Sequence, residues 1–317
     1  MAYQTGSLTD LNSLRTTIHS FLTSNGWTLS TNVIHKGNVF ARIEYSTSTQ
    51  NHLKLYGGTG KDGGDLLIDE QITATLPDRK FNITLGTFTY HFFLESTPKD
   101  GFICMLSYGV RIAWLMFGES VKMAPYTGLG TYFGASWNKN IGTNTNTARY
   151  FSYGAGVTDG GTSGELVTNL CALPFMATNG AIPNCMIQCE EHASTWLGNG
   201  NEFGPGSNDD EETVVSQLLT MYLNFSGHNQ FNSQATLIPY YLTTFYGLND
   251  IGVLGYIDQI RSVRMTDFNT ADIFTLGSDQ WMVFPGYRKG TAYPNGRGFP
   301  VGISDSGLHG IAIKYNP

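Results

Sequence analysis

The most metal-like pattern in the chain consists of cysteines and one histidine. Cys185 and Cys189 are four residues apart, His192 follows three residues later, and Cys171 lies upstream. On a helix, positions 185, 189 and 192 would share one face. Zinc sites usually use tighter CxxC pairs, however, and Pro183 favours a strand or turn that would scatter these ligands. We therefore expect buried thiols and predict no metal site.

Four carboxylates are the candidates for a catalytic pair: Glu95, Glu119, Asp159 and Glu191. Glycoside hydrolysis uses two carboxyl groups on either side of the bond that is cleaved. Spacing alone does not exclude such a pair, but any chain with 25 acidic residues offers many combinations. A polysaccharide depolymerase is therefore the weakest of three functional hypotheses, and we predict no catalytic residues.

Three glycine-rich segments approach known motifs without matching them. A phosphate-binding loop at Gly60 would need glycine where Leu55 stands and Ser or Thr where Asp62 stands. The segments 128–134 and 302–307 miss the dinucleotide fingerprint and the nucleophile elbow by the position of a glycine. We expect turns at all three places and predict no cofactor.

The histidines and clustered aromatic residues are equally open to a structural interpretation. None of the seven histidines stands in a recognised catalytic or metal-binding motif. An aromatic cluster could form a sugar-binding platform: Tyr240, Tyr241, Phe245 and Tyr246. Because side chains alternate between the two faces of a strand, we expect core residues with one exposed ring instead.

One helix is predicted at the start of the chain, within residues 1–25. Its apolar residues recur at three- and four-residue spacing: Leu11, Leu14, Ile18, Phe21 and Leu22. Ser7 or Thr9 is the expected cap, and Gly26 suits the position after the last turn.

Further along, apolar runs between turn-forming residues predict strands at 39–45, 52–56, 66–76, 81–95, 102–108 and 110–117. The expected turns lie at 36–38, 57–64, 77–78 and 98–101. The longest apolar run, 102–117, is too short for a membrane span and contains Arg111, so it predicts paired core strands. We predict strands for 213–225 and 235–246, although the acidic residues 209–212 also suit a helix start, and short strands beyond 250.

Composition favours the same fold class. The chain of 317 residues has 38 Gly, 13% aromatic and only 14% charged residues, and Gly, Asn and Thr make up nearly a third of it. These proportions predict a mainly β protein with sandwich-like antiparallel sheets and long Gly/Asn/Thr-rich loops. We divide it into the helix 1–25, a β lobe 26–135, a loop-rich segment 136–210 and a C-terminal β lobe 211–317. One continuous domain over 26–317 is the alternative that the sequence leaves open.

Charge and the first residues limit the partners and the compartment. The net charge is −7 and no basic cluster occurs, which argues against nucleic acid as a partner. The first ten residues have neither a basic nor an apolar region, so we expect no signal peptide and reduced cysteines.

Several segments resemble a family of virion structural proteins from tailed bacteriophages. Residues 113–122 and 132–136 are similar to its central "FGxxxK … YxxGS" segment. Residues 252–265 and 277–289 look like its "LGYxxxIRxVRM" and "WxVFPxxRK" elements, and 306–315 resembles its final strand. The opening helix followed by Gly26 and Trp27 is also similar to the start of the family.

The resemblance implies a non-enzymatic subunit of a phage particle, assembled in the host cytoplasm and located in the virion. Our first hypothesis is a cyclic homo-oligomer of the neck or collar, the tail or the baseplate that binds other virion proteins. The second is a receptor- or glycan-binding protein of the tail tip or a fibre. The resemblance is weakest over 138–210, where we expect contacts with particular neighbours or a receptor.

Overall fold

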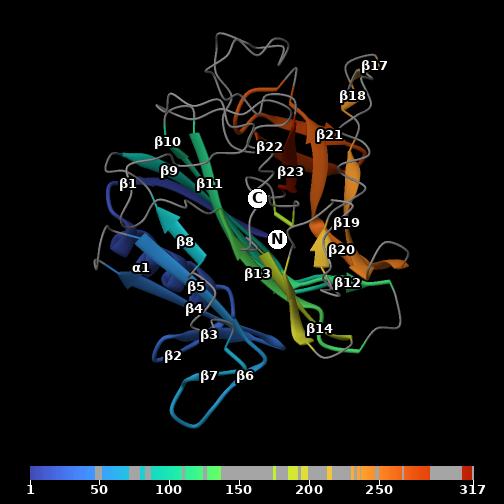
Figure 1. Ribbon diagram of the computed structural model, residues 1–317. Coiled ribbons are helices and arrows are strands. Elements are labelled where there is room, and N and C mark those ends of the chain that lie inside the picture. The colour runs from blue at the N-terminus through green and yellow to red at the C-terminus, as the bar shows by residue number, and fades with distance from the viewer. Residues whose placement is uncertain are drawn as a thin grey trace, which may run out of the picture.

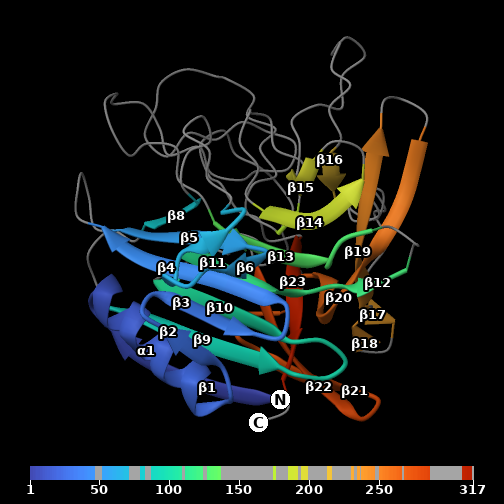
Figure 2. The ribbon, with the colours of Figure 1, turned by 90° about the horizontal axis from the view of Figure 1, so that it is seen from below.

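The computed structural model describes residues 1–46, 52–70, 79–82, 87–108, 111–123, 127–136, 174–175, 185–191, 194–198, 213–215, 230–231, 234–235, 237–246, 250–265, 268–285 and 309–315. Over these residues the predicted fold class is confirmed: the chain is mainly β, its sheets are antiparallel, and a helix lies near the N-terminus. Most of the predicted loop segment 136–210 lies outside the described residues. Three sheets are stacked as layers, with strands from residues 28–82 on one side and strands from the C-terminal part of the chain on the other (Figures 1 and 2).

The middle layer, which we call the central sheet, draws its strands from distant parts of the chain. Its order is β1 (Ala2–Leu8), β9 (Phe88–Glu95), β10 (Gly101–Tyr108), β11 (Arg111–Glu119), β13 (Thr131–Ala135), β14 (Cys185–Glu191) and β15 (Ser194–Gly198). The predicted pairing of the longest apolar run is confirmed, because Phe102 of β10 lies opposite Phe117 of β11.

Both faces of the central sheet are buried, which explains that run. In β10, Phe102, Cys104 and Leu106 face one core, and Ile103 and Met105 face the other. A strand that is covered on both sides shows no alternation of polar and apolar residues. The two hydrophobic cores lie on the two faces of the central sheet, and a different outer layer covers each of them.

The first outer layer is the N-terminal sheet together with α1 (Leu11–Ser24). The sheet has the order β2 (Thr28–Ser30), β3 (Val33–Lys36), β4 (Val39–Ser46), β5 (His52–Gly58) and β8 (Arg79–Asn82). All five apolar helix residues predicted from spacing are buried. They pack with Ile34, Ile43 and Leu55 against the central sheet. The turn predicted at 36–38 is also confirmed, with Gly37 at a φ of 56°.

The second outer layer is the C-terminal sheet. Its order is β16 (Thr213–Val215), β19 (Ile238–Tyr246), β20 (Asp250–Arg264), β23 (His309–Lys314), β22 (Asp279–Pro285) and β21 (Ile273–Leu276), and β12 (Val121–Lys122) also pairs with β20. Its apolar face, including Leu242, Ile257, Ile260 and Ile313, packs on the central sheet. Two short hairpins complete the described strands: β6 (Gly60–Lys61) with β7 (Leu67–Ile68), and β17 (Gln230–Phe231) with β18 (Gln234–Ala235).

The structure corrects the predicted start of the chain. Residues 2–8 form an edge strand on β9 instead of belonging to a helix, and α1 begins only at Leu11. The cap is Asp10, whose Oδ1 accepts a 2.7 Å hydrogen bond from the backbone N–H of Ser13, and not Ser7 or Thr9. Seven residues of extended chain find partners on β9, and this pairing outweighs the local helix-start signals.

Two strand boundaries also differ from the prediction. The segment 57–64 is not one turn, because β5 continues to Gly58 and β6 starts at Gly60. The strand predicted for 66–76 is only two residues long where it is described, and Asp69 at a φ of 49° ends it. The prediction for 213–225 is confirmed only for 213–215, and the rest of that segment lies outside the described residues.

Candidate functional site

Residues 185–191 form strand β14 and not a helix, in keeping with the strand or turn that Pro183 favours. Cys185 lies in β14 and is fully buried in the core between the central and C-terminal sheets. The strand has an irregularity between Gln188 and Glu191, and the side chains of Cys189 and Glu191 are outside the described set, as are Cys171 and His192. Cys104 is buried too, and burial raises the pKa of its thiol. Among the described residues, no three His, Cys, Asp or Glu side chains lie close enough to hold a metal ion.

Two of the four candidate carboxylates lie on opposite faces of the central sheet. Glu95 follows Phe93 by two residues and shares its face, toward the C-terminal sheet. Glu119 follows Phe117 by two residues and shares the opposite face, where it pairs with Lys99 at 2.9 Å. A sheet therefore separates the two carboxyl groups, and they cannot act on one bond. Asp159 and the side chain of Glu191 lie outside the described residues.

The aromatic cluster on β19 divides between the two faces of its sheet, as predicted for a core strand. Tyr240 is fully buried and its hydroxyl donates to the backbone carbonyl of Pro174. Tyr241 is half-buried on the other face and makes an edge contact with Tyr256 of β20, with 6.1 Å between the ring centres. Phe245 and Tyr246 belong to β19, but their side chains are outside the described set.

Two of the histidines lie inside the protein. Burial lowers the pKa of His91 to about 4, and its Nδ1 is 2.9 Å from the Tyr3 hydroxyl. Burial, with a smaller effect of Arg15, lowers the pKa of His19 on α1 to about 4. Both imidazoles are therefore neutral at neutral pH; His91 is buried and His19 is half-buried on α1.

The exposed feature with the most organised geometry is the β6–β7 hairpin, which projects from the N-terminal sheet (Figure 1). We call residues 60–68 the tip. Leu67 is its anchor: it is buried and packs with Val33 and Tyr56. Since side chains alternate along a strand, its neighbours Leu66 and Ile68 point the other way, with 64% and 44% of their surface exposed.

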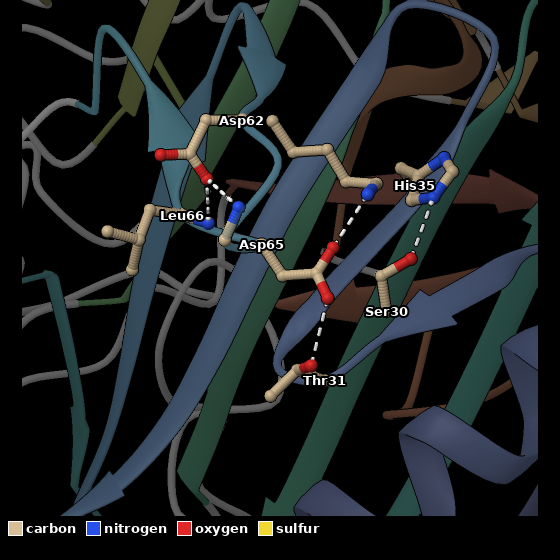
Figure 3. Close-up of polar contacts among 8 residues, drawn as sticks. Ser30, Thr31, His35, Asp62, Asp65 and Leu66 are labelled. Carbon is tan, nitrogen blue, oxygen red and sulfur yellow. Dashed lines mark hydrogen bonds and ion pairs between the residues drawn. The ribbon is translucent and has the colours of Figure 1, made fainter.

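Aspartates fix the turn of the tip (Figure 3). Oδ1 of Asp62 accepts hydrogen bonds from the backbone N–H of Gly64, at 2.8 Å, and of Leu66, at 2.9 Å. Asp65 has a φ of 58°, a left-handed conformation that Asp and Asn tolerate better than most residues. The turn conformation is therefore set by side-chain acceptors for its own backbone N–H groups.

A second set of contacts ties the tip to the β2–β3 turn (Figure 3). Asp65 accepts from Lys61 at 2.6 Å and from the hydroxyl of Thr31 at 2.9 Å, and these bonds lower the pKa of its carboxyl group. Beyond the turn, Thr59 donates to Asp69 at 2.6 Å. The apolar side chains of Leu66 and Ile68 are thus presented to solvent on a frame held by hydrogen bonds from two separate turns.

Inside the protein, one row of residues crosses four strands of the central sheet. Register pairs Glu95 with Gly101, Gly101 with Gly118, and Gly118 with Tyr132. The two glycines leave a gap in the layer of side chains, and Gln259 of β20 fills it: its Nε2 occupies the space of a β-carbon on Gly101 and lies 3.5 Å from the Tyr132 hydroxyl.

Sequence reasoning found Glu95 but not its neighbours. Gly101 and Gly118 read as ordinary turn and strand residues, because only the register of three strands places them side by side. The tip was expected as a turn over 57–64 followed by a strand from residue 66. The three consecutive apolar residues Leu66, Leu67 and Ile68 were a usable signal. Because side chains alternate along a strand, both faces of this segment are apolar, and exposed apolar side chains at the surface are unusual.

No helix in the described part of the chain is both long and apolar enough to cross a bilayer. Neither a model of a known protein family nor a curated protein matches this chain.

Proposed function

We propose that this chain is a non-enzymatic structural subunit of a tailed-phage particle, a cyclic oligomer of the neck, collar or tail. The proposal rests on one observation: the segments that resemble the phage family contact one another inside the fold. Gly118 and Tyr132 of the central motif meet Gln259 of the C-terminal motif at the interface of two sheets. Arg261 of that motif also stacks on Trp281 of the next, 5.2 Å from the ring centre. The resembling residues form the frame of the fold, which is what a family of structural subunits would retain.

The tip supplies the contact in this proposal, and its occupant is a neighbouring copy of the chain. A ring closes through two different patches of each subunit that complement one another. The tip is apolar at Leu66 and Ile68 and acidic at Asp62, and Asp69 follows directly after it. A second surface, at β12 and β20, exposes Met123 and Val253 beside the cation of Lys122. Figure 1 shows the β6–β7 hairpin and β12 on different sides of the molecule, as a head-to-tail contact requires.

Native mass spectrometry of the purified protein at several concentrations tests the proposal. We expect a discrete six- or twelve-fold assembly. The double variant Leu66→Ser/Ile68→Ser should shift it to monomer without changing the fold. The matched control is Ile273→Ser/Leu276→Ser, which removes two similarly exposed side chains from β21 and should leave the assembly intact.

The outcomes separate the function from the contact. A monomer at every concentration contradicts a self-assembling subunit, and a stable trimer favours the fibre or receptor-binding hypothesis, for which glycan binding would then be measured. An intact ring in the tip variant would reject the tip as the contact while the structural role stands.

A further inference from the structure

The amide of Gln259 is incompletely satisfied in the interface between the central and C-terminal sheets. Only 3% of the residue is exposed, and its Oε1 has no hydrogen-bond partner. Its Nε2 has a long contact with the Tyr132 hydroxyl at 3.5 Å. A buried acceptor without a donor costs free energy, so the position calls for a group that can donate a proton.

Register places Glu95 next to this amide. It is 6% exposed and stands directly opposite Gly101, over which the Gln259 amide lies. Directly opposite residues of antiparallel strands have β-carbons about 5 Å apart, so the Glu95 carboxyl extends over the same gap. A carboxylate can only accept hydrogen bonds, whereas a neutral carboxyl group can donate one to Oε1.

The surroundings of Glu95 decide which form is present. Burial is the main reason that its pKa is raised from 4.5 to about 7, and the carboxylate of Asp258 on β20 raises it further. Cations oppose this: Lys314 on β23, the α-amino group of Met1 and Arg261 on β20. Other titratable groups also line this core among the described residues. Burial raises the pKa of Tyr3 on β1, Tyr132 on β13 and Tyr240 on β19, and His91 of β9 is neutral. Cys185 of β14 and Tyr315 lie there too.

We propose that Glu95 and Gln259 form a proton-dependent latch between the central and C-terminal sheets. The neutral carboxyl group donates a hydrogen bond to Oε1 of Gln259, and loss of that proton leaves a buried carboxylate beside Asp258 and an acceptor without a donor. The latch concerns the core of a single chain and does not depend on the proposed function.

The direction of the pH dependence follows from the two pKa values. The folded protein binds the Glu95 proton more tightly than the unfolded chain, whose carboxyl titrates near 4.5. The stabilisation is complete below about pH 4.5 and is lost as the pH rises through about 7.

The test is urea unfolding of the wild type and of Glu95→Gln between pH 5 and pH 8.5. The amide in the Glu95→Gln variant can donate at every pH. Residue 95 should therefore contribute little to any change in the unfolding constant of this variant over the pH range. The unfolding constant of the wild type should rise on the order of tenfold or more relative to that variant. Equal pH profiles for the two proteins would overturn the latch.

Two further variants separate the hydrogen bond from burial alone. Gln259→Met removes the acceptor and should reduce the difference between pH 5 and pH 8.5, and an undiminished difference would show that Gln259 takes no part. Asp258 is partly exposed. Asp258→Asn should move the midpoint of the pH-dependent loss of stability to lower pH, because it removes the negative charge that raises the pKa of Glu95. An unmoved midpoint would assign the titration to another group.

Discussion

The ring of Phe133 occupies the space in which a β-carbon on Gly57 would stand. Gly57 belongs to β5 of the N-terminal sheet and Phe133 to β13 of the central sheet, so the missing side chain lets the two layers approach. Both residues are buried, and Phe133 also makes an edge contact with Trp196, 5.3 Å between ring centres. The ring therefore has little room to move away.

We expect Gly57→Ala to destabilise the protein by about 1–3 kcal/mol, the usual range for an overpacked core. Gly63 is the matched control, because nothing lies within 4 Å of a β-carbon there. Urea unfolding monitored by tryptophan fluorescence measures both variants. Equal stability of the two would mean that the layers are not held at this distance.

The N-terminal cap of α1 gives a second prediction. Asp10→Ala should lower the free energy of unfolding by about 1 kcal/mol, because it removes the acceptor of the Ser13 N–H. Ser7→Ala, at the residue that sequence reasoning favoured, should change stability by less, since Ser7 lies in β1. Thermal unfolding followed by circular dichroism compares them, and the reverse order would place the cap at Ser7.

Acid sensitivity gives a third prediction. The imidazole of His91 has a pKa of about 4 in the folded protein against 6.5 in the unfolded chain. Because the folded-state value is the lower one, stability is present above pH 6.5 and lost as the pH falls toward 4, by at most about 3 kcal/mol. His91→Gln should remove this contribution to the loss of stability in acid. His19→Gln should remove the similar contribution of the histidine on α1, whose pKa is also about 4.

Unfolding curves at pH 7 and pH 4.5 measure the acid effect. Tyr3→Phe is a useful companion, because it removes the hydroxyl that bonds to Nδ1 while leaving His91 buried. An acid loss that is the same in the wild type and in the double variant lacking both histidines would contradict neutral imidazoles in the cores.

A fourth prediction concerns the contact between Arg261 of β20 and Trp281 of β22. Arg261→Met should cost about 1 kcal/mol, since it removes the cation over the Trp281 ring and the hydrogen bond to the carbonyl oxygen of Asp258 at 2.5 Å. Arg42→Met, which likewise lies over the ring of Tyr56 at 3.8 Å, is the comparison in the other outer layer. A fluorescence change specific to Arg261→Met would report the altered surroundings of Trp281.

Local patterns predicted elements well where one interaction dominates. The helix face of Leu14 and Ile18 and the paired strands of the apolar run 102–117 follow from periodicity and burial alone. The strand at residues 2–8 could not be predicted in this way, because its partner, β9, begins 80 residues later and local signals point to a helix.

The candidate sites were predicted less completely, for a physical reason. Glu95 was visible as a carboxylate, but its face relative to Glu119 depends on strand parity, and its neighbours depend on register across β10 and β11. The tip depends on a hydrogen bond between Asp65 and Thr31, which lie in two different turns and are 34 residues apart in the sequence. Neither relationship has a signature in the spacing of one segment.

The order of the layers differs from the order of the chain, and this has a consequence for synthesis on the ribosome. The strand β1 is synthesised first, and α1 and the strands of the N-terminal sheet follow it, whereas β9, on which β1 pairs, comes only after them. The apolar face of α1 has its main surface only after β9–β11 have emerged. We therefore expect the nascent N-terminal third to stay protease-sensitive until residue 119 has left the ribosome, and then to become protected in one step.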